Sequence, residues 1–166
     1  MNQKSIQKRI LFLCQGALVA ALYVLLTLLS ATFGLSSGVI QLRVSEALCI
    51  LPIFFPAAVP GLFVGCLIAN LLASGMILID ILVGSLATLL GALGAYWLRR
   101  HPMLVPLPTV LANVLLIPPV LIFGYGLSDA WWFMMLTVGI GEILSAYVLG
   151  LLLYSALKKR NMAYPH

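Results

Sequence analysis

Charged side chains are what this sequence has least of. Of its 166 residues, nine are Lys or Arg and four are Asp or Glu, so that 8% of the chain is charged. Soluble domains carry about 25% charged residues, and the few present here could not cover the surface of a soluble fold. Hydrophobic residues make up 63% of the chain and the mean hydropathy is +1.17. The sequence therefore predicts an all-α integral membrane protein.

Signatures of catalysis and metal binding are missing as well. The sequence has no G-x-x-x-x-G-K-[ST] phosphate loop, so nothing suggests that the chain hydrolyses ATP itself. Neither His101 nor His166 belongs to a cluster with metal-ligand spacing, and no nucleophile–base pair is apparent. Cys14, Cys49 and Cys66 lie in apolar sequence without CxxC spacing, which favours reduced thiols that pack as small hydrophobic groups. We expect no enzyme activity, no metal and no cofactor.

The positive charges that are present form three short clusters beside apolar runs. They are Lys4, Lys8 and Arg9, then Arg99, Arg100 and His101, then Lys158, Lys159 and Arg160. Cytoplasmic segments of membrane proteins are enriched in Lys and Arg, so all three clusters are predicted to be cytoplasmic. Their position beside apolar spans argues against nucleic-acid binding.

With all three clusters on one side, each interval between them must hold an even number of membrane crossings. A crossing helix needs about 20 residues, and turn-forming residues divide the intervals at 34–44, 56–61, 74–75 and 124–129. The chain is therefore predicted to be a single membrane domain, residues 1–166, with cytoplasmic termini and a bundle of six helices at 10–33, 45–58, 59–74, 77–98, 104–124 and 131–157. The second and third are short, so we expect neighbouring helices to shield them from lipid. Pro118 and Pro119 predict a kink or a break in the fifth helix.

A few ionisable and amide side chains fall inside these predicted spans. Each charge at membrane depth costs about 2.5–3.5 kcal/mol on insertion scales, so such residues are candidates for function. The candidate binding residues are Arg43, Glu46, Asn70, Asp80, Asn113 and Glu142. The predicted topology concentrates them in the outer half and centre of the bundle, with Arg43 and Glu46 at the rim. This distribution predicts a pocket that opens to the outside, rather than a continuous pore.

Structural roles for the same residues remain open. Arg43 and Glu46, at i and i+3, can form a local ion pair. Asp80 can sit at interfacial depth near a helix N-terminus, and Asn113 can link two helices. Glu142 is harder to explain in this way, because it lies about 15 Å below the outer start of its helix and has no basic residue at that depth.

Small residues recur in the first predicted helix. Gly16, Ala17, Ala20 and Ala21 form a patch that predicts a docking surface for another membrane subunit. Close packing within the bundle is the alternative, because small residues let membrane helices approach one another.

Four segments resemble a known family. They are GVIQLRVSEALCILPIFFPAAVPGLFVGCLIANLL (38–72), DILVGSLATLLGAL (80–93), VPLPTVLANVLL (105–116) and VGIGEILSAYVLGLLL (138–153). These segments are similar to the QueT family, the substrate-binding S components of energy-coupling factor (ECF) transporters for queuosine precursors. The resemblance implies a six-helix protein in the plasma membrane of a prokaryote. It also implies docking, through the small residues of the first helix, on the transmembrane scaffold EcfT, which carries two ATPase subunits.

The implied substrate is a 7-deazaguanine, such as 7-aminomethyl-7-deazaguanine, or queuine. We hypothesise that Glu142 accepts hydrogen bonds from the N–H edge of the base and that Asp80 or Glu46 meets the ammonium group. Asn70, Asn113 and Arg43 would complete the hydrogen bonding. Two alternatives remain: an S component for another vitamin such as biotin or thiamine, and an autonomous proton-coupled carrier that uses Glu142 as its relay.

Overall fold

Every regular element in the described residues is helical, as predicted. The computed structural model describes residues 3–35, 42–73 and 78–159. The elements are α1 (Gln3–Thr32), the 3₁₀ helix η1 (Val44–Ile53), α2 (Ala58–Ala73), α3 (Leu78–Trp97), the short 3₁₀ helix η2 (Pro102–Leu104), α4 (Leu107–Phe123), α5 (Trp131–Glu142), the π-helical η3 (Ile143–Leu149) and α6 (Gly150–Lys159). The predicted turns at residues 74–75 and most of the predicted outer loop lie outside the described residues.

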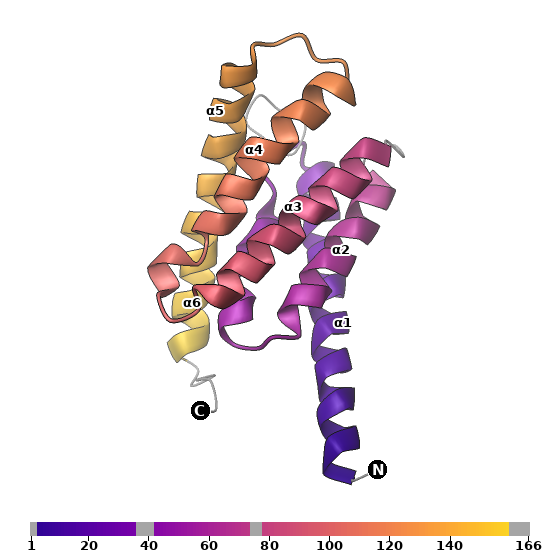
Figure 1. Cartoon of the computed structure of the whole chain (residues 1–166), viewed down its shortest axis with the longest axis vertical. Coiled ribbons are helices and arrows are strands. Elements are labelled where there is room, and N and C mark those ends of the chain that lie inside the picture. The colour runs from indigo at the N-terminus through magenta and orange to yellow at the C-terminus, as the bar shows by residue number, and fades with distance from the viewer. Residues whose placement is uncertain (1–2, 36–41, 74–77, 160–166) are drawn as a thin grey trace.

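Helical segments occur at all six predicted positions, and they differ in their capacity to cross a membrane. Four are long and apolar enough, namely Gln3–Thr32, Leu78–Trp97, Pro102–Phe123 and Trp131–Lys159. The other two, η1 and α2, are shorter. Figure 1 shows the start of α1 and the end of α6 at the same end of the bundle, as an even number of passes requires. Six crossings and cytoplasmic termini remain predictions.

The shortest of the six segments, η1, lies at the centre of the bundle. A 3₁₀ helix rises about 2.0 Å per residue, so its 10 residues extend further than the same number in an α-helix. Every residue from Ser45 to Pro52 is buried. Helices α1, α3 and α6 and the π-helical segment η3 all contact η1. The prediction that this short segment is shielded by its neighbours is confirmed.

Two glycines of α2 bring it close to α1. A Cβ atom on Gly61 would lie 2.6 Å from the carbonyl oxygen of Gly16, and one on Gly65 would lie 2.9 Å from the Cα of Ala20. Only glycine allows the two backbones this close approach. Ala20 is therefore buried, and Gly16 is partly covered, whereas Ala17 and Ala21 remain exposed. The four small residues predicted to form one docking patch are thus divided between an internal interface and the outer surface.

Helix α4 and the last helical segment are both continuous. Helix α4 runs from Leu107 to Phe123 through Pro118 and Pro119, so the helix does not break there, and a kink stays a prediction. The last helical segment also runs unbroken from Trp131 to Lys159, but its hydrogen bonding changes to the π pattern directly after Glu142. Figure 1 shows this segment beside α4 along much of its length.

Candidate functional site

The polar residues predicted to be functional come from five different elements, and nearly all are deeply buried. The exposed fraction is 1% for Glu46, 2% for Asn70, 3% for Asp80, 4% for Asn113 and 6% for Glu142. Arg43, which precedes η1, is half-buried. Burying a polar group is costly unless it finds a partner, so the partners of each residue determine what it can do.

Glu46 has partners for both of its carboxylate oxygens. The hydroxyl of Tyr23 in α1 donates a short hydrogen bond to Oε1, and the thiol of Cys49 lies 3.2 Å from Oε2. Because it is almost fully buried, Glu46 does not lie at an exposed rim, and that part of the prediction is wrong. Sequence spacing could not identify Tyr23 as its partner, because the two residues are 23 positions apart.

Arg43 faces several members of the cluster. Its guanidinium interacts electrostatically with Tyr23, Asp80 and Glu46. No salt bridge joins Arg43 to Glu46 in the part of the chain that the structure describes, so the local ion pair considered from their spacing is not formed. Arg43 instead supplies positive charge to the cluster as a whole.

Asp80 and Asn70 connect α2, α3 and the connection between α4 and α5. The hydroxyl of Tyr125 donates to Asp80 Oδ2 at 2.9 Å, and the side-chain amide of Asn70 donates to the backbone carbonyl of Asp80 at 3.4 Å. A Cβ atom on Gly84 would lie 2.7 Å from Asn70 Nδ2, so only glycine there leaves room for the amide. Asp80 is thus buried and hydrogen-bonded. It also lies in the first turn of α3, so the interaction with a helix N-terminus remains open as a structural role.

Glu142 and Asn113 differ from these residues because each has one polar atom that is buried without a hydrogen-bond partner. Glu142 Oε2 and Asn113 Nδ2 are buried without a partner, as are the hydroxyls of Thr109 and Ser145. An unsatisfied buried group typically costs about 1–3 kcal/mol, and each one in a folded protein calls for an explanation such as a bound molecule or an ordered water. Four such groups therefore indicate a place where something polar binds.

These four groups come from two neighbouring segments, α4 and the junction of α5 with η3. Thr109 and Asn113 are i and i+4 on α4, and Glu142 and Ser145 are i and i+3 at the junction of α5 and η3, so each pair shares one helix face. The side chains of Asn113 and Glu142 interact with each other. Thr109 and Ser145 are absent from the candidates named from the sequence, although helical spacing from Asn113 and Glu142 could have identified them.

Electrostatic interactions link the polar residues around Glu46 with those around Glu142. Glu142 interacts with Glu46 and, with opposite sign, with Arg43. Cys49 of η1 interacts with both Glu46 and Glu142 and also with Thr109. Carboxylates thus outnumber the single arginine, which suits a solute that offers several hydrogen-bond donors or a positive charge. Among the described residues, no group of His, Cys, Asp and Glu has the arrangement of a metal site.

The π-helical segment begins at the residue after Glu142. π-helical turns are rare, and they occur frequently at functional sites. The widened turn therefore adds a second observation, independent of burial, to the unpartnered groups around Glu142.

The described residues are helical, include four apolar segments of membrane-crossing length and enclose a buried polar cluster, and these features fit the class of polytopic membrane proteins. The sequence model of the QueT transporter family matches residues 13–159, and the chain belongs to this family. The resemblance noted from its sequence segments is thereby confirmed.

A similar protein in another organism extends the comparison. The chain is 41% identical, over 73 residues, to the queuosine precursor transporter QueT of Lactococcus lactis subsp. cremoris (strain MG1363). The aligned part covers 44% of this chain and 42% of that protein, which is less than half of either. No significant match to a solved structure was found.

Proposed function

We propose that this chain is the substrate-binding S component of an ECF-type transporter and that it imports a queuosine precursor. The substrate is a 7-deazaguanine such as 7-aminomethyl-7-deazaguanine, or queuine. Membership of the QueT transporter family and the name of the Lactococcus relative support the substrate class. The observation that carries the proposal is the set of unpartnered buried groups centred on Glu142 and Asn113.

The chemistry of a deazaguanine matches these groups. Its adjacent N–H donors suit the Glu142 carboxylate, which accepts hydrogen bonds at both oxygens. The amide of Asn113 can donate to or accept from the base, and Arg43 can donate to its carbonyl. Ligand binding would thus satisfy atoms that the free protein leaves unsatisfied.

The aminomethyl group adds a cation, which we assign to Asp80. Both oxygens of Glu46 already have donors in Tyr23 and Cys49, whereas Tyr125 occupies only Oδ2 of Asp80. An ionised carboxylate has about four lone-pair positions, so Asp80 can accept an ammonium beside Tyr125. In this proposal Asn70 orients Asp80, and Glu46 contributes negative charge from the protein interior.

The energy for import would come from partners. We propose six membrane crossings with cytoplasmic termini, in the plasma membrane of a prokaryote, and assembly with EcfT and two ATPase subunits. Ala17 and Ala21, which are exposed on α1, would form the contact with EcfT. Gly16 and Ala20 would support that face from the α1–α2 interface.

Calorimetric titration of the detergent-purified protein with 7-aminomethyl-7-deazaguanine tests the substrate assignment. We expect Glu142→Gln to weaken binding at least about 10-fold, because it removes a charged acceptor. The matched control is Asp129→Asn, which removes an exposed carboxylate outside the cluster and should leave the dissociation constant unchanged.

Two results would contradict the proposal. Equal affinity of the Glu142→Gln and parent proteins would remove Glu142 from the site. Binding of biotin or thiamine in place of the deazaguanine would reassign the substrate. Uptake into liposomes that is driven by a pH gradient, without scaffold or ATPases, would favour a proton-coupled carrier instead.

A further inference from the structure

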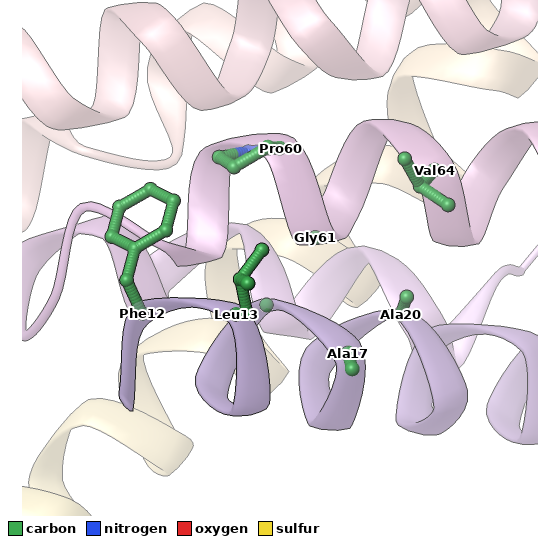
Figure 2. Close-up of a pocket in the computed structure, with 8 residues that line it drawn as sticks. Phe12, Leu13, Ala17, Ala20, Pro60, Gly61 and Val64 are labelled. Carbon is green, nitrogen blue, oxygen red and sulfur yellow. The ribbon is translucent and has the colours of Figure 1, made fainter. Parts of the chain in front are cut away.

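A groove with apolar walls follows the outer surface between α1 and α2. Figure 2 shows Phe12, Leu13 and Ala17 of α1 facing Pro60 and Val64 of α2 across it. Its volume is about 270 Å³. Small side chains on α1 keep the groove open, because bulkier ones at these positions would fill it.

One end of this groove is basic. A second hollow of about 410 Å³ is lined by Lys8 and Arg9 together with Phe12 and Leu13. Because Phe12 and Leu13 line both hollows, the two adjoin on the surface of α1. Two exposed cations at one end and an apolar channel at the other match a molecule with an anionic head and a hydrocarbon tail.

The length of the feature matches one membrane leaflet. From Arg9 to Ala20 the helix rises about 17 Å at about 1.5 Å per residue. The hydrocarbon core of a bilayer is about 30 Å thick, so one leaflet contributes about half of that. With Arg9 at the headgroup level, the groove would end close to the centre of the bilayer.

We propose that this groove is a binding site for one anionic phospholipid, whose headgroup contacts Lys8 and Arg9 and whose acyl chain lies against Ala17 and Val64. A parallel second copy of the chain fits less well, because it would bring its own Lys8 and Arg9 towards the same basic end. The residues of the lipid site are separate from the buried polar cluster. Ala17 belongs also to the proposed EcfT contact, so lipid and scaffold would exclude each other at that residue.

Native mass spectrometry of the detergent-purified protein, titrated with phosphatidylglycerol or phosphatidylcholine, tests the site. We expect one phosphatidylglycerol to be retained in preference to phosphatidylcholine. Each Lys or Arg beside anionic lipid contributes about 1 kcal/mol, so the double variant Lys8→Gln/Arg9→Gln should weaken phosphatidylglycerol binding about 25-fold. Lys158→Gln/Lys159→Gln, which removes two cations from the end of α6, should leave the preference intact.

The apolar part of the site has its own matched pair of variants. Val64→Trp should fill the groove and abolish retention, whereas Ile68→Trp, one turn further along α2 at similar exposure, should not. Ala17→Phe fills the groove from the α1 side and serves if Val64→Trp fails to fold. Equal effects of the two Trp variants, or of the two charge variants, would overturn the proposal. So would a dimer that Val64→Trp dissociates while lipid retention stays unchanged.

Discussion

Glu46 and Glu142 are buried carboxylates of one polar cluster in opposite hydrogen-bonding states. Glu46 accepts from Tyr23 and Cys49, and it thereby joins α1 to η1. One oxygen of Glu142 is buried without a partner. A satisfied carboxylate contributes to the folded structure as it stands, whereas an unsatisfied one is destabilising until a donor arrives. The cluster therefore contains one carboxylate, Glu46, that links two elements, and a second, Glu142, that can still accept a hydrogen bond.

Removal of the hydroxyl that Glu46 accepts should destabilise the free protein. Tyr23→Phe leaves a buried carboxylate oxygen without its donor, and we expect a loss of about 1–3 kcal/mol. Thermal unfolding in detergent would measure it. Tyr154→Phe, which changes a partly exposed tyrosine at the other end of the chain, is the control and should have little effect. A Tyr23→Phe protein as stable as its parent would show that Glu46 has found another donor.

Removal of the hydroxyl of Thr109 or Ser145 should have the opposite effect on the stability of the free protein. Their hydroxyls are buried without partners, so Thr109→Val or Ser145→Ala removes an unsatisfied group and should leave the unfolding temperature of the free protein equal or higher. If the bound deazaguanine or its water uses these hydroxyls, its dissociation constant should rise by about 5- to 10-fold, as expected for the loss of one hydrogen bond of about 1 kcal/mol or slightly more. Lower stability of the free variants would show that the hydroxyls have partners after all.

At the scale of the helices, the positions of glycine residues determine which pairs of helices can pack closely against each other. Gly61 and Gly65 lie against α1, and Gly91 and Gly94 of α3 lie against Thr109 and Pro108 of α4. In lipid, apolar side chains gain little by leaving the solvent, so close packing of this kind carries much of the association between helices. These contacts hold the elements that carry the polar cluster.

Gly65→Ala should therefore be disruptive although it adds one methyl group. The new Cβ would lie 2.8 Å from the Cβ of Tyr23 and 2.9 Å from the Cα of Ala20, and overpacking of this kind costs about 1–3 kcal/mol. Gly139→Ala is the matched control, because its Cβ meets only Val114 at 3.4 Å and the change favours the helix by up to about 1 kcal/mol. Thermal unfolding of the two variants should shift in opposite directions, and a shared direction would contradict the packing argument.

The same helices show what can be read from the sequence. Apolar runs separated by turn residues and basic clusters located all six helical segments. Most of the predicted helix ends lie within a few residues of the observed ends, because hydropathy and turn chemistry are local properties. Local properties do not reveal which face meets which neighbour. For this reason the pairing of Glu46 with Tyr23, the coverage of Ala20 by Gly65 and the continuation of α4 through Pro118 became apparent only in the folded chain.

The site was predictable to a similar degree. The rarity of charge in apolar sequence identified Glu46, Asp80 and Glu142 as unusual, and the structure brings them into one electrostatically linked cluster. Which of them has free hydrogen-bonding capacity depends on partners that are distant in sequence. Thr109 and Ser145 were not identified because hydroxyl side chains are common in membrane helices. In the sequence, a hydroxyl that lacks a hydrogen-bond partner looks the same as one that has a structural partner.

At the scale of the whole molecule, ligand binding and assembly should be separable. Ala21 is exposed on α1, away from the buried cluster, so Ala21→Trp should block the proposed contact with EcfT and reduce uptake in cells that carry the scaffold and ATPases. The dissociation constant of the purified protein for the deazaguanine should not change. Leu90→Trp, on the exposed side of α3, is the control and should support normal uptake. Reduced affinity in Ala21→Trp would show that the substitution acts on the bundle and not on docking.

The π-helical segment lets the last helix hold one residue more than continuous α-helical winding would. Successive residues of an α-helix are rotated by about 100° about its axis, and a π turn accommodates one residue more than an α turn does. Deletion of a single residue between Ile143 and Leu149 would restore α-helical winding there. It would leave Glu142 in nearly its present orientation relative to Gly150, which packs beside Ala47 of η1, because the π turn takes up the extra residue with a smaller rotation per residue. The carboxylate of Glu142 and the helix from Gly150 onward thus keep their relative orientation although one surplus residue lies between them, so natural variants that lack that single residue should retain both faces of the helix.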